Sequence, residues 1–349
     1  TKSVDTVKDG YRGYKDVNVN AMKILIEYDE NYYEAAPEYP EHFKKQGHEV
    51  VVFPSNSKTI GNVPAEKIKE MVTGCDIISR QNIKITEELL DLAPNLRLIT
   101  TFGAGFDGAN VELCGKRGIP VINGRGGGAP SVAELSIGMM MSLSRKLPKY
   151  DHEMRKDIWN GVMGSELTGK TVGIIGVGAI GGYLAKMVVH GFDAKVLAYD
   201  VVPNPELTEK YGVEYVSLET LCRESDYISV HTPLFPSTRG MINKNLFDIM
   251  KPTAFFINVS RGPVVVEEDL YDALKNNRIA GAGLDVFDPE PPVNNRFAEM
   301  DNVVMTPHVG ANTAETATRI AAMHIQSIED AIAGREIRGN IVNKQYLNK

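Results

Sequence analysis

The sequence feature that most constrains the fold is a glycine pattern near the middle of the chain, Gly176-Val-Gly-Ala-Ile-Gly181. It directly follows an apolar, β-branched run at Thr171–Ile175 and precedes a run with helical spacing. In such a strand–turn–helix unit, Gly176 permits a tight turn, Gly178 lets the backbone approach a pyrophosphate, and Gly181 lets the helix pack close to the strand. The pattern therefore predicts a dinucleotide-binding α/β domain, with these three glycines at the cofactor.

A carboxylate follows the next expected strand of this domain. Asp200 comes directly after Lys195–Tyr199, at the spacing typical of the residue that accepts hydrogen bonds from the adenosine ribose. It would repel a 2′-phosphate, and the following Val201-Val-Pro203 offers no cation to bind one. The sequence therefore predicts NAD rather than NADP as the cofactor.

Short apolar runs alternate with helical patterns along nearly the whole chain, which is typical of parallel β-α units. An N-terminal series of strands is expected at 23–28, 49–53, 76–79 and 97–100, and a second series at 171–175, 195–199, 227–230, 254–257 and 280–284. Two series of this kind predict two sheets, and so two α/β domains.

A glycine cluster at Asn123–Pro130 marks the joint between the two series. Ser131 and Glu134 after it have the spacing of a capping box, which predicts the start of a long helix through Met139–Met141. We expect these methionines to pack in the core or at a subunit interface. A closing helix is expected at 313–333, and residues before Met22 form a polar extension.

Composition excludes several classes of protein. The chain has 349 residues, a formal net charge of -7 and no run of lysine and arginine, which argues against nucleic-acid binding. Cys75, Cys114 and Cys222 lie far apart without C-x-x-C spacing, which predicts no disulfide framework, no metal site and a reducing, cytoplasmic location. The first residues lack an apolar signal, and the most apolar window, 172–189, is interrupted by glycines. We therefore expect no secretory signal and no membrane partner.

Three loops after separate strands carry residues that suit hydride transfer to a carbonyl. They are Asn258–Pro263 with Arg261, Asp285–Pro292 with Glu290, and Thr306–Ala311 with His308. The reaction needs a clamp on the substrate anion, a proton donor for the forming alkoxide, and a group that keeps this donor charged. An arginine fork, a histidine and a carboxylate meet these needs in turn.

With these loops and the glycine pattern, the chain resembles the D-isomer-specific 2-hydroxyacid dehydrogenase family from Met22 to the last helix. The resemblance implies an enzyme that interconverts a small 2-oxo acid and its D-2-hydroxy acid by hydride transfer with NAD. It implies that Arg261 orients the substrate, that His308 is the catalytic acid and base, and that Glu290 is its partner. It also implies a homodimer.

The resemblance assigns further residues to the cofactor and the substrate. Besides Gly176, Gly178, Gly181 and Asp200, the implied cofactor residues are Ala179, Ile180, Thr232, Val259, Ser260, Asp285 and Gly310, with Asp285 on the nicotinamide carboxamide. The implied substrate residues are Gly103, Ala104 and Gly105, whose amide groups receive the carboxylate, together with Arg80. We expect structural roles for the other histidines, His42, His48, His152, His190, His231 and His324.

The family's architecture predicts the fold class and the domain boundaries. The expected fold is α/β, with two doubly wound parallel-sheet domains and a Rossmann NAD-binding domain inserted into a flavodoxin-like substrate domain. The substrate domain is expected at 1–123 and again at 312–349, with the NAD-binding domain at 124–311.

Two other functions stay open at this point. One is D-3-phosphoglycerate dehydrogenase, whose members commonly place an arginine where this chain has Thr101, although Arg80 or Arg125 could supply a cation for a phosphate. The other is an NAD(H)-sensing corepressor, although we expect no long docking tail and no regulatory domain after the last helix. The L-specific dehydrogenases are excluded because they place the glycine pattern at the N-terminus rather than in the middle of the chain.

Overall fold

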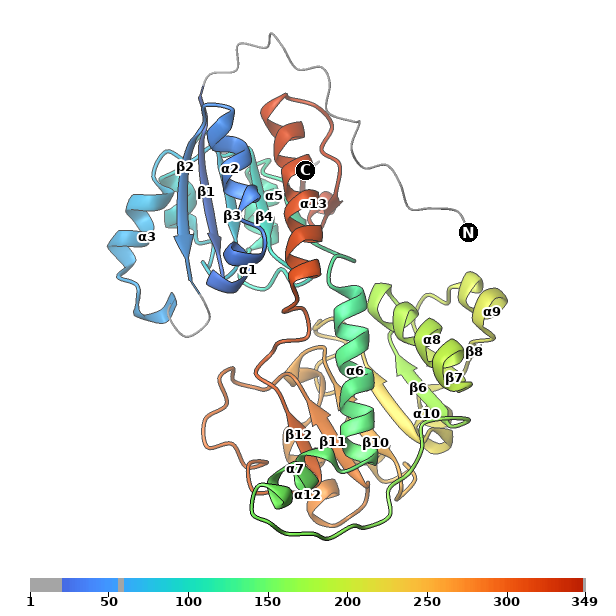
Figure 1. Ribbon diagram of the computed structural model, residues 1–349. Coiled ribbons are helices and arrows are strands. Elements are labelled where there is room, and N and C mark those ends of the chain that lie inside the picture. Colours follow the sequence, from blue (N-terminus) through green and yellow to red (C-terminus); the bar gives the residue numbers. More distant parts are fainter. Residues whose placement is uncertain (1–20, 56–59, 348–349) are drawn as a thin grey trace, which may run out of the picture.

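The computed structural model describes residues 21–55 and 60–347, which form two α/β units that lie end to end (Figure 1). The polar extension expected before Met22 lies almost wholly outside the described residues. The chain passes between the units twice, before α6 (Ala129–Ser144) and before α13 (Ala314–Ile332).

Six strands form the sheet of the first unit: β1 (Lys23–Tyr28), β2 (Glu49–Pro54), β3 (Ile77–Arg80), β4 (Leu98–Thr101), β5 (Val121–Asn123) and β13 (Asn340–Ile341). Their order is β13-β5-β4-β3-β1-β2, and β1 to β5 are parallel. β13 instead pairs with β5 in antiparallel fashion, which the sequence did not predict. The segment after α13 thereby returns to the first sheet.

Seven strands form the second sheet: β6 (Thr171–Ile175), β7 (Lys195–Tyr199), β8 (Glu214–Tyr215), β9 (Tyr227–Val230), β10 (Phe255–Asn258), β11 (Gly281–Leu284) and β12 (Val303–Met305). Their order is β12-β11-β10-β9-β6-β7-β8, and every pair is parallel. The strand order reverses between β6 and β9. In doubly wound sheets, ligands bind beyond the carboxyl ends of the strands at such a point.

Helices cover both faces of each sheet (Figure 1). Around the first sheet lie α13 with α1 (Glu30–Ala35), α2 (Glu38–Lys45), α3 (Ala65–Val72), α4 (Glu87–Asp91), α5 (Val111–Lys116) and α14 (Lys344–Leu347). Around the second lie α6 with α7 (Leu147–Met154), α8 (Ala179–Phe192), α9 (Pro205–Tyr211), α10 (Leu218–Glu224), α11 (Lys244–Phe247) and α12 (Glu267–Lys275). Short 3-10 turns occur at Ile60–Asn62 and Gly262–Val264.

Each sheet has an apolar core on both of its faces, as a doubly wound fold requires. Along β1, Ile24 and Ile26 enter one core while Leu25 enters the core on the opposite face. Met139 and Met140 of α6 are buried in a core beside the second sheet, which confirms the expected packing role. No helix among the described residues is long and apolar enough to cross a membrane.

The predicted capping box at the start of α6 is wrong. The helix begins at Ala129, and Pro130 occupies its first turn, where the missing N–H of proline costs no hydrogen bond. Ser131 therefore lies inside the helix, and its Oγ lies 2.8 Å from Oγ1 of Thr313 and 2.7 Å from Oγ1 of Thr316. This serine joins the starts of α6 and α13, which are the two places where the chain crosses between the units.

Candidate functional site

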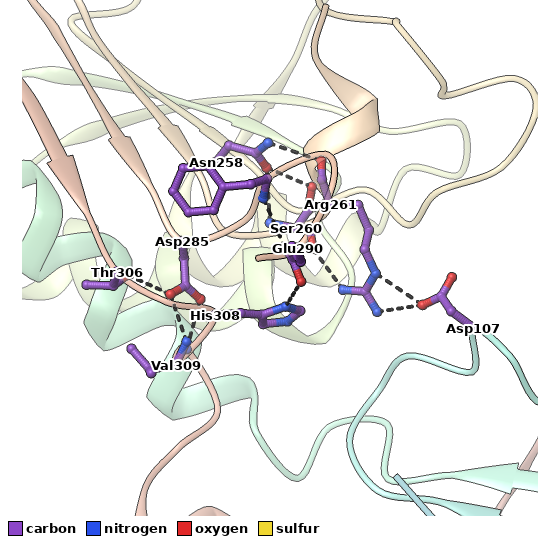
Figure 2. A network of polar contacts seen from close by, with 11 residues as sticks. Asp107, Asn258, Ser260, Arg261, Asp285, Glu290, Thr306, His308 and Val309 are labelled. Atoms are coloured by element: carbon purple, nitrogen blue, oxygen red, sulfur yellow. Dashed lines mark hydrogen bonds and ion pairs between the residues drawn. The ribbon is translucent and has the colours of Figure 1, made fainter. Parts of the chain in front are cut away.

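His308 and Glu290 form a close pair at the carboxyl edge of the second sheet (Figure 2). The His308 Nδ1 atom lies 2.7 Å from Glu290 Oε2, within the range of charge-assisted hydrogen bonds. The His308 backbone has φ of +55°, a left-handed conformation that is uncommon for residues other than glycine. Because Nδ1 faces the carboxylate, Nε2 is the ring nitrogen left for another partner.

Glu290 is held in its ionised form. Burial alone would raise its pKa, but the hydrogen bond and charge of His308, the N–H of Phe287 and the charge of Arg261 together hold the pKa below its ordinary value. The Phe287 N–H donates to Glu290 Oε1 at 3.0 Å. A carboxylate that stays ionised favours the protonated form of an adjacent imidazole.

Asp285 fixes the turn that carries His308. Its Oδ1 accepts hydrogen bonds from the Thr306 hydroxyl at 2.6 Å and the Val309 N–H at 2.8 Å, and its Oδ2 accepts one from the Gly310 N–H at 2.9 Å. The side chain is buried. A carboxylate accepts about four hydrogen bonds, so three of these positions hold the turn and about one is left for the expected contact with a cofactor carboxamide.

Arg261 is held by its own loop and by the first unit. The Asn258 side chain donates to the Arg261 carbonyl at 3.1 Å and accepts from the Ser260 N–H at 3.1 Å, so it shapes the turn after β10. The Arg261 guanidinium donates to the Ser260 carbonyl at 2.8 Å. Its other contacts are with Asp107 of the first unit, at 3.2 Å from Nε and 3.0 Å from Nη2 (Figure 2). Val259 and Ser260, expected near the nicotinamide, are buried in this same loop.

The glycine loop of the first unit presents amide groups beside Arg261. The three carbonyl groups of this loop accept hydrogen bonds from neighbouring residues of the first unit. Gly103 accepts from Gly124 N at 2.6 Å, Ala104 from Asn123 Nδ2 at 2.5 Å, and Gly105 from Thr101 Oγ1 at 2.7 Å. The amides of Gly103, Ala104 and Gly105 donate to no acceptor in the described part of the chain. A Cβ at Gly105 would collide with the Arg261 guanidinium. The loop and the arginine therefore converge on one place.

Arg80, which the resemblance assigns to the substrate, is the last residue of β3 and is almost fully buried. It is 4% exposed, and its Nη1 donates to the Asp107 carbonyl at 3.0 Å. Its Nη2 donates to the Gln81 carbonyl. Its Nε is buried without a partner among the described residues, and burial lowers the pKa of the guanidinium. Arg125 is exposed in the crossing segment.

The turn after β6 fits a dinucleotide. Gly176 has φ of +89°, and a Cβ at Gly181 would collide with the Gly176 carbonyl oxygen, so the helix approaches the strand as expected. A Cβ at Gly178 would meet no atom within 4 Å, which leaves room above the turn. Ala179 and Ile180 open α8, where amide groups lack helical partners and attract anions.

Asp200 and Thr232 lie beside this turn. Asp200 Oδ2 accepts from the Val177 N–H at 2.8 Å and Oδ1 from the Val202 N–H at 3.0 Å, which leaves acceptor positions for ribose hydroxyls. Thr232 Oγ1 is buried without a hydrogen-bond partner within the described ranges, and its Cγ2 approaches Gly176. A ligand group at this turn would satisfy that hydroxyl, so the residues present fit the expected cofactor.

The other histidines lie away from the His308–Glu290 pair. His231 is buried, with Nε2 2.9 Å from Ser229 Oγ, and burial lowers its pKa to about 3, so the ring is neutral. His324 is buried beside Tyr39 and Thr100 in the first unit. His42 pairs with Glu329 at 2.8 Å.

Sequence reasoning missed Asp107, Asn258 and Thr306, each of which holds a site residue. Asp107 stands two residues after the glycine loop Gly103–Gly105, and an acidic side chain next to such a loop was the available signal. The ion pair between Asp107 and Arg261 joins loops of the two different units. The sequence does not reveal such a contact, because the two residues lie far apart along the chain.

Comparisons with known proteins give one family model and several similar proteins. The family model of the D-isomer specific 2-hydroxyacid dehydrogenase, NAD binding domain, matches residues 137–310. Glyoxylate reductase from Thermococcus litoralis is 38% identical over 291 residues, covering 81% of this chain and 86% of that protein. D-3-phosphoglycerate dehydrogenase from Homo sapiens is 36% identical over 289 residues, covering 82% of this chain and 54% of that protein, so this chain spans about half of its length. D-lactate dehydrogenase from Aquifex aeolicus, crystallised with NAD and lactic acid, gives a TM-score of 0.79 at 31% identity, covering 92% of this chain and 99% of that one.

Proposed function

This chain belongs to the D-isomer specific 2-hydroxyacid dehydrogenase family, and from that premise we propose that it interconverts small, unphosphorylated 2-oxo acids and their D-2-hydroxy acids. The family is one of NAD-dependent oxidoreductases that act on CH–OH donors. The observation that carries the proposal is the 2.7 Å His308–Glu290 pair, which stands beside the loop of Arg261 at the carboxyl edge of the second sheet.

NADH, when bound, supplies the hydride that reduces the carbonyl carbon. His308 donates its proton from Nε2 to the carbonyl oxygen, and in the opposite direction it takes the proton from the hydroxyl. Glu290 stabilises the imidazolium form and holds the ring through Nδ1. Arg261 and the free amides of Gly103–Gly105 bind the substrate carboxylate between the two units.

We assign the cofactor to the turn after β6. The amides at the start of α8, Ala179 and Ile180, would hold the pyrophosphate, and Asp200 would bind the adenosine ribose. Thr232 would lie along the adenosine half, and we assign Val259, Ser260, Asp285 and Gly310 to the nicotinamide end. The charge of Asp200 and its apolar neighbours Val201 and Val202, both largely exposed, favour NAD over NADP.

Two residues of the first unit favour a substrate without a phosphate. Thr101, at the position where phosphoglycerate dehydrogenases commonly have an arginine, uses its hydroxyl on the Gly105 carbonyl. Arg80 is buried and donates to two backbone carbonyls. A charge-assisted contact contributes about 1.5–3 kcal/mol, roughly tenfold to a hundredfold in affinity, so the lack of one weakens binding of a phosphate strongly.

The division of the chain that we propose is 1–123 and 312–349 for the substrate domain and 124–311 for the NAD-binding domain. We also propose a homodimer, because exposed apolar side chains gather in and after α7. They are Leu147 (52% exposed), Met154 (51%), Ile158 (46%), Trp159 (89%), Val162 (41%) and Met163 (92%). An apolar surface of this kind is typical of a protein–protein interface.

The proposed function is tested by a panel of 2-oxo acids assayed with NADH. Pyruvate, hydroxypyruvate, glyoxylate and larger 2-oxo acids are compared with 3-phosphohydroxypyruvate by kcat/KM. We expect an unphosphorylated acid to be the best substrate. A hundredfold or greater preference for the phosphorylated acid would identify a phosphoglycerate dehydrogenase instead, with Arg80 or Arg125 holding the phosphate. Steady turnover of any of these acids excludes a purely NAD(H)-sensing role.

A further inference from the structure

Asp107 and Arg261 form an ion pair that joins the two units. Oδ2 of Asp107 accepts hydrogen bonds from both Nε and Nη2 of Arg261, at 3.2 and 3.0 Å (Figure 2). Asp107 follows the glycine loop of the first unit, and Arg261 follows β10 of the second. The pair therefore exists only when the two units stand close together.

The contact with Asp107 occupies one edge of the guanidinium and leaves its end free. Arginine has five N–H groups. Asp107 takes one on Nε and one on Nη2, and the Ser260 carbonyl takes one on Nη1. One N–H therefore remains on each terminal nitrogen, and these two donors are available to a second carboxylate.

The free end lies beside the free amides of the glycine loop. Nη2 of Arg261 is so close to Gly105 that a Cβ at that position would collide with it. The amides of Gly103–Gly105 donate to no acceptor in the described part of the chain. An anion bound here would receive hydrogen bonds from both units at once.

The backbone of Asp107 is in turn held by Arg80. Its carbonyl accepts a hydrogen bond from Nη1 of the buried Arg80 at 3.0 Å. The carboxylate thus projects toward Arg261 from a backbone that is fixed to β3. This gives Arg80 a part in placing Asp107.

We propose that Asp107 is the positioning residue for Arg261: it holds the Nε and Nη2 edge so that the two remaining N–H groups point at the substrate carboxylate. The proposal rests on the proposed function. Asp107 itself does not contact the substrate in this proposal. Replacing Asp107 should therefore alter catalysis only through the orientation of the Arg261 guanidinium.

The chain offers a matched control for this ion pair. Asp107 and Arg261 have side chains 65% and 29% exposed, and Asp91 and Arg117 of the first unit pair at 2.6 Å with side chains 64% and 30% exposed. We expect Asp107→Ala to lower kcat for 2-oxo acid reduction about tenfold, since an aligned charge-assisted contact is lost. The KM for NADH should change less than threefold. Asp91→Ala should leave kcat within twofold of the wild-type value.

The route of the effect is tested in an Arg261→Lys background. Lysine keeps the positive charge but has no planar edge to be held. Asp107→Ala should therefore change kcat less than twofold in that background. A tenfold fall there as well, or a kcat within twofold of wild type for Asp107→Ala alone, would overturn the proposal. Asp107→Asn replaces the alanine variant if the latter does not fold.

A measurement without substrate separates this inference from the proposed function. In ¹⁵N-labelled protein, the Nε–H resonance of Arg261, identified by its loss in Arg261→Lys, should exchange with water at least fivefold faster in Asp107→Ala than in wild type. Equal exchange rates would contradict the positioning role even in an active enzyme. If the wild type reduced no 2-oxo acid, the proposed function would fail, and the exchange rates alone would decide whether Asp107 holds Arg261.

Discussion

At the scale of single residues, each proposed catalytic group is held by a second side chain. His308 is paired with Glu290, its turn is fixed by Asp285, and Arg261 is held along one edge by Asp107. Such support matters because catalytic groups must be ordered before the substrate arrives.

The pairing of Glu290 with His308 predicts a shift in pH dependence. Burial opposes ionisation of Glu290, but the hydrogen bond and charge of His308 and the Phe287 N–H hold its pKa below the ordinary value, so this side chain places a negative charge beside the His308 ring. Glu290→Gln removes this negative charge next to the proposed proton donor. We expect the alkaline limb of kcat/KM for 2-oxo acid reduction to move about one pH unit lower. Profiles measured from pH 5 to 9 that superimpose would remove Glu290 from this role.

Asp200 predicts the cofactor preference. Asp200→Ala should raise the KM for NADH about tenfold and narrow the difference between NADH and NADPH, because the ribose contact and the repulsion of a 2′-phosphate are both lost. Asp200→Asn is the control, since its amide oxygen can still accept from the Val177 N–H and support the turn. A wild-type enzyme that used NADPH as well as NADH would refute the assignment.

At the scale of elements, the nine expected strands agree with β1 to β4, β6, β7 and β9 to β11 to within about one residue, because the sheets are parallel and buried on both faces. β5, β8 and β12 were not predicted, since each has only two or three residues. Buried parallel strands appear in the sequence as short continuous apolar runs, as at Thr171–Ile175. β13 escaped prediction because it has two residues and pairs with β5 across more than two hundred positions. The start of α6 was misplaced because Ser131 bonds α13 rather than its own helix end.

The end of α13 depends on a buried carboxylate. Asp330 has a side chain 1% exposed and accepts hydrogen bonds from Arg338 Nε at 2.8 Å and Nη2 at 2.7 Å, and from Arg335 Nε at 3.1 Å. The Arg338 bonds chiefly lower the pKa of Asp330 to about 2. This carboxylate therefore anchors the segment that leads from α13 back to β13.

Asp330→Asn should lower the free energy of unfolding at pH 7 by about 1–2 kcal/mol. Because the folded-state pKa is depressed, the stabilisation is present above about pH 4 and is lost as the pH falls toward 2. Thermal unfolding at pH 7 and pH 3 should show a difference between variant and wild type that shrinks at the lower pH. Asp151→Asn, which breaks the exposed pair with Arg155, should leave the thermal unfolding unchanged at both pH values.

At the scale of the whole molecule, the candidate site combines groups from both units. Arg261, Glu290 and His308 could be proposed from the sequence because each stands in a loop of recognisable composition, and the loops of Arg261 and Glu290 directly follow expected strands. The contact of Arg261 with Asp107 could not, because it depends on how the two sheets face each other. The burial of Arg80 and its hydrogen bond to the Asp107 carbonyl likewise depend on tertiary packing.

The exposed apolar segment in and after α7 predicts the assembly state. We expect sedimentation at micromolar concentration to give about twice the 38.3 kDa mass of one chain. Trp159→Glu should shift the protein toward the monomer, because it places a charge on an apolar interface. Val293→Glu alters another exposed apolar residue, 72% exposed, and should leave the assembly unchanged. A wild-type protein that sediments as a monomer would contradict the proposed homodimer.

The central claim, that His308 is the acid and base of the reaction, is tested most directly by kcat of His308→Asn. Asparagine tolerates the left-handed backbone at this position, so the turn is preserved while the proton donor is removed. We predict a kcat for 2-oxo acid reduction lower by about 10²–10⁴-fold, with a Kd for NADH within about threefold of wild type. His190→Ala, at an exposed position near the end of α8, should keep full activity. A kcat for His308→Asn within tenfold of wild type would show that another group donates the proton.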